Sequence, residues 1–127
     1  MPTVLIADSD DTARVLLAQT LRDEGYEVVE ARDGTAAIAQ AARADLIFLD
    51  VNMPDVGGRE MLSTIRNTPA LCRTPVILLS ALLESGDCYY ETDKFPAGYT
   101  VFLLKPVRTT ELLSSIRMLL RARAHQK

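Results

Sequence analysis

The sequence predicts an α/β fold in which a doubly wound parallel sheet of five strands carries helices on both faces. Short apolar runs alternate along the chain with segments whose apolar residues recur at helical spacing. Turn residues or charged residues bound the runs, as is typical of strands buried on both faces of a parallel sheet. The 127 residues fit one domain, and we expect it to span positions 1–127.

Each apolar run is interpreted as one strand. The run that leads into Asp50 is followed by turn residues, as is typical of a strand buried on both faces, so Asp50 is expected at the carboxyl end of a central strand. Right-handed crossovers place the ends of all parallel strands on one edge of the sheet, where such folds have their ligand crevices. The expected strands are Thr3–Ala7, Tyr26–Ala31, Leu46–Leu49 with Asp50, Val76–Leu79 and Val101–Leu104.

Five segments between and after the strands are predicted to be helical. A fourth inter-strand helix is expected within Leu82–Gly98, but Gly86 and Pro96 and a weak apolar periodicity indicate that it is short or irregular. The other helices are expected around Ala13–Leu21, over Thr35–Arg43, around Met61–Ile65 with an end before Pro69, and around Leu112–Leu120 behind Thr109.

Composition excludes several classes of protein. The net charge of -3 argues against nonspecific nucleic-acid binding, which needs a basic face. No signal peptide or long apolar run is visible, so no membrane partner is expected. Cys72 and Cys88 are interpreted as free thiols in a reducing cytoplasm.

Charged and polar residues follow the predicted strands at the shared edge. Asp8, Asp50, Ser80 and Lys105 are expected to meet there. Crowded carboxylates repel one another unless a proton or a hard cation relieves them, and oxygen ligands of this kind suit Mg²⁺. An ammonium and a hydroxyl beside the metal can hold phosphoryl oxygens. The pattern therefore favours phosphoryl transfer onto or off Asp50.

Several motifs, in order, resemble the receiver domain of two-component response regulators. They are the acids after the first strand, DVNMPDVGG around Asp50, SA at Ser80–Ala81 and KP at Lys105–Pro106. The resemblance covers nearly the whole chain. It implies a flavodoxin-like sheet and a signalling domain that is not an enzyme, apart from slow self-dephosphorylation at most.

The resemblance also implies a phosphorelay site. Asp50 matches the residue that accepts a phosphoryl group from a phosphohistidine of a sensor histidine kinase or phosphotransfer protein. Asp8 matches the first acid of the metal pair. The backbone carbonyl of Asn52 matches the group that, with Asp8 and Asp50, completes the protein ligands of Mg²⁺.

The remaining matches concern the response to phosphorylation. Lys105 matches the lysine that pairs with the acyl phosphate, and Ser80 matches the hydroxyl that bonds a phosphate oxygen. Phe102 falls at the switch aromatic, although it could equally be a plain apolar strand residue. In this family the switch alters the face of the fourth helix, fifth strand and fifth helix, which a downstream effector or output domain reads.

One position departs from the family pattern. The second acid of the pair, usually a direct Mg²⁺ ligand, is replaced by Ser9. A neutral hydroxyl binds a hard cation less well than a carboxylate, so weaker Mg²⁺ binding is expected. Asp10 is a candidate replacement ligand, but helix capping alone also explains it.

Two other functions remain open at this point. A pseudo-receiver that binds partners without phosphorylation is favoured by Ser9. A small phosphatase of the haloacid dehalogenase type also uses an aspartyl phosphate, but it places an acid two residues after the nucleophile, where this chain has Asn52. The chain stops about one helix after Lys105, so we expect either a stand-alone receiver or part of a longer protein.

Overall fold

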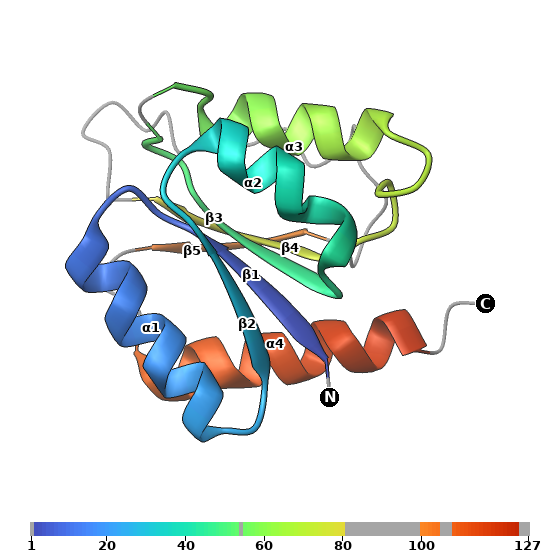
Figure 1. The fold of residues 1–127 in the computed structure, drawn as a ribbon. Coiled ribbons are helices and arrows are strands. Elements are labelled where there is room, and N and C mark those ends of the chain that lie inside the picture. Colours follow the sequence, from blue (N-terminus) through green and yellow to red (C-terminus); the bar gives the residue numbers. More distant parts are fainter. Residues whose placement is uncertain (1, 54, 81–99, 105–107, 125–127) are drawn as a thin grey trace.

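The computed structural model describes residues 2–53, 55–80, 100–104 and 108–124. Its sheet has five strands, all parallel, in the order β2-β1-β3-β4-β5. The predicted sheet is therefore confirmed, with the Asp50 strand at its centre (Figure 1). The strands are β1 (Thr3–Ala7), β2 (Glu27–Ala31), β3 (Leu46–Asp50), β4 (Val76–Ser80) and β5 (Thr100–Leu104).

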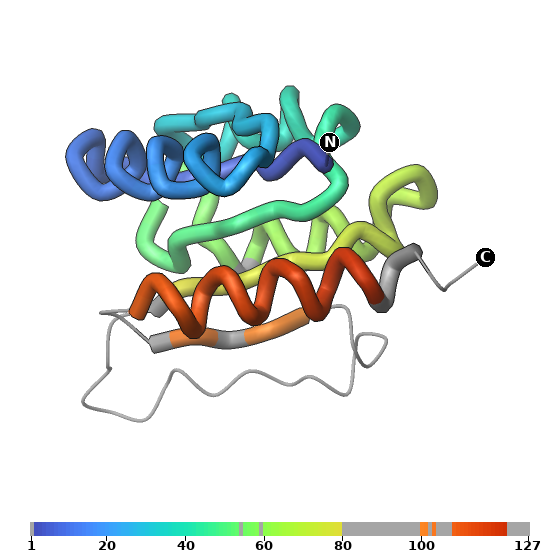
Figure 2. Tube along the Cα trace, turned by 90° about the horizontal axis from the view of Figure 1, so that it is seen from below, coloured from blue at the N-terminus to red at the C-terminus, as the bar shows by residue number. Residues whose placement is uncertain are grey.

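Helices cover both faces of this sheet. The helices α1 and α4 lie against one face, while α2 and α3 lie against the other (Figures 1 and 2). The irregular fourth helix expected within Leu82–Gly98 falls outside the described residues, so the label α4 belongs to the predicted C-terminal helix. The bounds are α1 (Asp11–Asp23), α2 (Gly34–Gln40), the 3₁₀ turn η1 (Ala41–Arg43), α3 (Gly58–Asn67) and α4 (Thr109–Ala124).

The core has two layers because side chains alternate along each strand. In β3, Ile47 and Leu49 pack toward α2 and α3, whereas Leu46 and Phe48 pack toward α1 and α4. All five residues of β3 are buried. This explains why the strand sequence is continuously apolar up to its last residue, Asp50.

Element ends differ from the predictions by a few residues. The helix predicted over Thr35–Arg43 is divided into α2 and η1, since its last turn tightens into 3₁₀ geometry. The helix α3 begins at Gly58, three residues before Met61, the first apolar residue on which its prediction was based. No helix in the described part of the chain is long and apolar enough to cross a bilayer.

Candidate functional site

Strand register brings three of the predicted site residues to one edge of the sheet. Ala7 of β1 lies opposite Leu49 of β3, so Asp8 and Asp50 are the next residues on neighbouring strands. Asp50 in turn lies opposite Leu79 of β4, and Ser80 follows it at the end of that strand. The carboxyl ends of the three strands therefore meet, as the sequence predicts.

Both carboxylates at this edge are buried. Asp8 is 3% exposed and Asp50 is 4% exposed. Asp8 Oδ1 accepts a hydrogen bond from the backbone N–H of Asp10 at 2.9 Å, and Asp50 Oδ1 accepts one from that of Asn52 at 3.0 Å. Each acid thus fixes the turn that follows its own strand. Burial of two neighbouring negative charges is unfavourable unless a cation or a proton is close.

The donor set fits Mg²⁺, which binds to one or two carboxylates and keeps several waters. Ser9 is exposed and adds no carboxylate. Within the described ranges, no group of three or more His, Cys, Asp or Glu side chains is arranged to hold a metal ion. Asp8 and Asp50 are therefore the two buried carboxylates that the described residues place at this edge.

Asp10 acts as the N-cap of α1. Its Oδ1 accepts hydrogen bonds from the backbone N–H groups of Thr12 at 3.0 Å and Ala13 at 3.2 Å. A carboxylate in this position also interacts favourably with the helix dipole. The sequence left two roles open for Asp10, helix capping and metal ligation. The hydrogen bonds to Thr12 and Ala13 show that it caps α1.

A groove of about 560 Å³ begins at the two aspartates of this turn and runs along α1 toward α4. Its walls include Leu16 and Leu17 of α1, and Leu112 of α4. Leu16 and its neighbour Val15 are among the large apolar side chains that α1 exposes to solvent. The acidic turn therefore borders an apolar surface.

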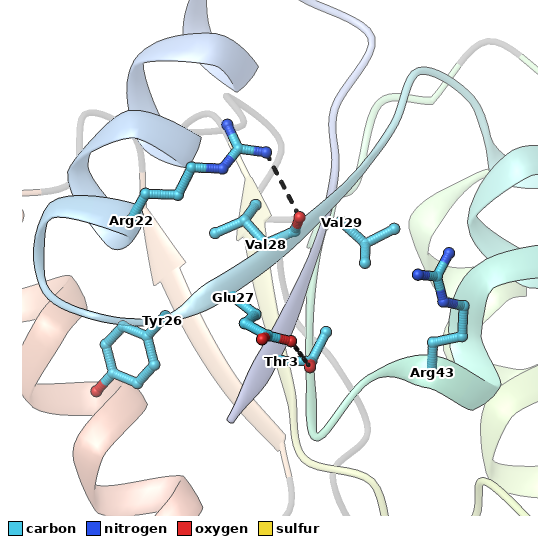
Figure 3. A pocket seen from close by; sticks show the side chains of 7 residues that line it. All are labelled: Thr3, Arg22, Tyr26, Glu27, Val28, Val29 and Arg43. Atoms are coloured by element: carbon cyan, nitrogen blue, oxygen red, sulfur yellow. Dashed lines mark hydrogen bonds between the residues drawn. The ribbon is translucent and has the colours of Figure 1, made fainter. Parts of the chain in front are cut away.

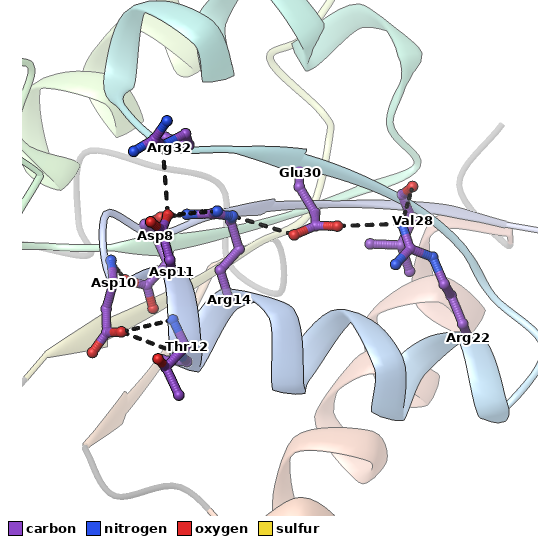
Figure 4. Close-up of polar contacts among 10 residues, drawn as sticks. Asp8, Asp10, Asp11, Thr12, Arg14, Arg22, Val28, Glu30 and Arg32 are labelled. Atoms are coloured by element: carbon purple, nitrogen blue, oxygen red, sulfur yellow. Dashed lines mark hydrogen bonds and ion pairs between the residues drawn. The ribbon is translucent and has the colours of Figure 1, made fainter.

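Arg14 contacts the acidic turn that follows β1 and carries Asp8, Asp10 and Asp11. The sequence analysis did not single out this arginine. Its guanidinium is buried and donates to the backbone carbonyl of Asp8 at 2.9 Å, to Asp11 Oδ1 at 2.7 Å and to Glu30 Oε1 at 3.2 Å (Figure 4). Glu30 also forms an ion pair with Arg22, with 3.4 Å between Glu30 Oε2 and a terminal guanidinium nitrogen of Arg22. An arginine three residues after an acid was the available signal, but that spacing alone predicts only a surface pair.

Electrostatic interactions favour the charged form of the Arg14 guanidinium. Burial acts to lower the pKa of Arg14, but hydrogen bonds and attraction to Asp11 and Glu30 outweigh it, so the pKa is raised overall. The hydrogen bond from Arg14 and the charge of Arg32 lower the pKa of Asp11. The Arg14 guanidinium and the Asp11 carboxylate are therefore ionised at neutral pH.

Gly58 supports the other side of the site. A Cβ on this residue would lie 2.7 Å from Val51 Cα and 3.0 Å from the carbonyl oxygen of Asp50. The glycine allows α3 to begin directly against the backbone of the aspartate. The backbone N–H of Gly58 also donates to the carbonyl of Val51 at 3.0 Å.

The remaining predicted residues are only partly placed. Ser80 ends β4, and Phe102 lies opposite Leu78 in the register of β4 and β5. Lys105 falls outside the described residues. It follows Leu104, which lies opposite Ser80 at the same edge.

A second pocket, of about 430 Å³, lies elsewhere on the molecule. It runs along β2 and includes Thr3 and Glu27, the first residues of β1 and β2, so it opens near the opposite edge of the sheet from Asp50. Arg22 and Arg43 approach it from either side of β2 (Figure 3). It contains none of the predicted site residues.

Comparison with known proteins agrees with this geometry. Residues 4–117 match the response regulator receiver domain family. The chain is 34% identical over 123 residues to the DNA-binding dual master transcriptional regulator RpaA of Synechocystis sp., covering 95% of this chain and 50% of that protein. It is 35% identical over 120 residues to the response regulator PleD of Caulobacter vibrioides, covering 93% and 26%. The chain thus spans half or less of the length of these relatives.

Solved structures show the same architecture. Chemotaxis protein CheY4 of Vibrio cholerae superimposes with a TM-score of 0.80 at 34% identity, over 94% of this chain and 98% of that one. A receiver domain protein of Methanospirillum hungatei gives 0.86 over 100% and 99%, and its 22% identity supports the fold alone. Receiver domains are signalling domains, which generally bind Mg²⁺ at the acidic pocket. The five parallel strands, the acids at their shared edge and these matches together show that the chain belongs to the response regulator receiver domain family.

Proposed function

We propose that this receiver accepts a phosphoryl group onto Asp50 from a phosphohistidine of a sensor histidine kinase or phosphotransfer protein. The observation that carries the proposal is the buried Asp50 carboxylate at the end of the central strand, beside the buried Asp8. A carboxylate oxygen of Asp50 attacks the phosphorus, an aspartyl O–P bond forms and the P–N bond of the phosphohistidine breaks.

The chain's own residues prepare this transfer. Asp8, Asp50 and the backbone carbonyl of Asn52 would hold Mg²⁺. When bound, Mg²⁺ neutralises charge on the phosphoryl oxygens. Ser9 contributes no charge, so we propose that Mg²⁺ binds more weakly here than where two acids precede the helix.

The response to phosphorylation is proposed to follow the family pattern. Ser80 and Lys105 would contact the phosphoryl oxygens, and Phe102 would act as the switch aromatic. The altered face would comprise β5, α4 and the fourth helix expected within Leu82–Gly98. We propose that a downstream effector or output domain reads it in the cytoplasm, that the chain itself binds no nucleic acid, and that self-dephosphorylation is slow at most.

Intact-mass spectrometry after treatment with acetyl phosphate and Mg²⁺ tests the proposal. The parent chain should gain one phosphoryl group, and Asp50→Asn should gain none. The matched control is Asp45→Asn, which alters an aspartate just before the other end of β3, where its carboxylate accepts a hydrogen bond from the Thr3 N–H at 2.8 Å. This control should still be phosphorylated, and an unmodified parent would refute the proposal.

A second candidate function is a partner-binding module that works without phosphorylation. Ser9 favours it, together with the finding that no three acids within the described part of the chain form a metal site. The same experiment separates the two functions. If the parent stays unmodified even at saturating Mg²⁺ while Ser9→Asp becomes phosphorylated, the module without phosphorylation is the better account.

A further inference from the structure

The loop between β3 and α3 carries two groups of the proposed site. Asp50 lies at its start, and Asn52, whose backbone carbonyl is a proposed Mg²⁺ ligand, lies two residues later. Asn52 is itself exposed. The position of its carbonyl therefore depends on how firmly the residues on either side are held.

The first half of the loop is fixed to the sheet. The backbone N–H of Val51 donates to the carbonyl of Leu79 at 2.9 Å, and the carbonyl of Val51 accepts from Gly58 at 3.0 Å. Met53 is buried in the core layer beneath α2 and α3. These contacts hold one end of the segment that presents the Asn52 carbonyl.

The second half of the loop is tied to a different element. Asp55 Oδ1 accepts a hydrogen bond from the backbone N–H of Gly34 at 2.7 Å, and Oδ2 accepts from the N–H of Thr35 at 3.0 Å and its hydroxyl at 2.6 Å. Oδ1 also accepts from the N–H of Val56 at 2.7 Å. One carboxylate thus links this loop to the first turn of α2, about twenty residues earlier in the chain.

The close approach depends on a glycine. A Cβ on Gly34 would lie 2.6 Å from Val56 Cβ and 2.9 Å from the Val56 carbonyl oxygen. Any side chain at Gly34 would therefore push the loop away from α2, whether or not Asp55 is present. The Asp55 carboxylate and the absence of a side chain at Gly34 are two features that serve the same contact.

Asp55 is not the N-cap residue of α2, although it accepts from N–H groups of the first turn. The N-cap of α2 is Asp33, whose Oδ1 accepts from the backbone N–H of Ala36 at 2.8 Å. Asp55 bonds the earlier N–H groups of Gly34 and Thr35 instead. Its additional effect is to connect the helix to the loop.

We propose that Asp55 and Gly34 form a latch that positions the Asn52 carbonyl and the Asp50 backbone for metal binding and phosphoryl transfer. Asp55 is thus a positioning residue, and its role in transfer rests on the function proposed above. Hydrogen bonds from the Thr35 hydroxyl and the Gly34 N–H hold the pKa of Asp55 well below its usual range. The latch is therefore charged at neutral pH.

The expected effect is moderate because Asp55 is exposed and water can replace part of its bonding. Removing outer-shell groups of metal sites typically costs about 10- to 100-fold in affinity. For Asp55→Ala we expect Mg²⁺ affinity and the rate of phosphorylation by acetyl phosphate to fall about fivefold, below that range. Asp55→Asn keeps one acceptor oxygen and should give a smaller loss, while Gly34→Ala should reproduce the loss with the carboxylate intact.

Asp33→Ala is the matched control, since it removes a carboxylate from the same helix end but leaves the latch. It should lower the melting temperature without changing Mg²⁺ affinity. Calorimetric Mg²⁺ titration, melting temperature and amide hydrogen exchange at Asn52 should be measured for all four variants. Equal Mg²⁺ affinities in Asp55→Ala and Asp33→Ala would overturn the latch.

Hydrogen exchange separates failure of the latch from failure of the proposed function. If the parent takes up no phosphoryl group, the proposed function fails, but the latch is still judged by exchange in the metal-free protein. Exchange at Asn52 should quicken severalfold in Asp55→Ala and Gly34→Ala but not in Asp33→Ala. Unchanged exchange in the first two variants would also overturn the latch.

Discussion

Truncation of Arg14 to alanine should destabilise the protein far more than truncation of Arg22, although both residues belong to α1 and both contact Glu30. The Arg14 side chain is 9% exposed, whereas that of Arg22 is 47% exposed. Arg14 bonds its partners at 2.7 to 3.2 Å, but the contacts of Arg22 are 3.4 and 3.5 Å long. Burial and geometry both predict the difference.

The magnitude follows from the partners. The Asp8 carbonyl loses a buried, charge-assisted hydrogen bond, which costs about 1.5–3 kcal/mol. Glu30 is 28% exposed and keeps Arg22, so its share is about 0.5 kcal/mol after screening. Asp11 is exposed and adds nothing to the sum. We therefore expect a loss of about 2–3.5 kcal/mol for Arg14→Ala and at most about 0.5 kcal/mol for Arg22→Ala.

Urea and thermal unfolding followed by far-UV circular dichroism provide the assay. For a domain of this size, the loss predicted for Arg14→Ala corresponds to a decrease in melting temperature of about 10 °C. Arg14→Lys keeps the charge but not the planar fork of donors, so it should recover only part of the stability. Equal losses in Arg14→Ala and Arg22→Ala would refute the role assigned to the buried guanidinium.

Three further predictions concern the acidic site and its loop. Ser9→Asp should tighten Mg²⁺ binding about tenfold, because a third carboxylate adds a ligand, and calorimetric titration measures this. It should also lower the stability of the metal-free protein, because the added charge repels the other two carboxylates, and thermal unfolding without metal measures this. Gly58→Ala should destabilise by about 1–3 kcal/mol in urea unfolding, since its Cβ would crowd Val51. Gly57→Ala, whose Cβ would meet nothing closer than 3.9 Å, should not. Because the pKa of Asp55 is lowered in the folded protein, its carboxylate stabilises the fold at pH values above the unfolded-state pKa of an aspartate, about 3.9. The difference in melting temperature between the parent and Asp55→Asn should therefore shrink as the pH falls below about 4. A difference that stays constant would contradict this.

The fold could be predicted because its signals are local. Each residue of β3 is buried, so its run of apolar residues needs no alternation, and Asp50 at its end stands out. The carboxylate of Asp10 precedes α1 directly, where capping residues are expected. Parallel strands with right-handed crossovers then bring Asp8 and Asp50 to one edge without any knowledge of side-chain packing.

The supporting contacts could not be predicted because they depend on tertiary approach. In the sequence, Arg14 is one of several arginines in predicted helices. Its role depends on the position of β2, which places Glu30 within hydrogen-bond distance. From the sequence alone, Asp55 is one more turn residue. Only the contact between the β3–α3 loop and α2 shows that its carboxylate accepts a hydrogen bond from the backbone N–H of Gly34. The start of α3 at Gly58 likewise reflects close contact with Asp50, which no local propensity encodes.

Residue-resolved NMR with beryllofluoride, a phosphoryl mimic, tests whether Asp50 is the phosphoacceptor. With Mg²⁺ present, we expect the largest shifts of backbone amide signals at Asp8, Asp50 and Ser80, and we expect Asp50→Asn to abolish them. Shifts that are absent from these three residues, or that persist unchanged in Asp50→Asn, would contradict the assignment of Asp50 as the phosphoacceptor.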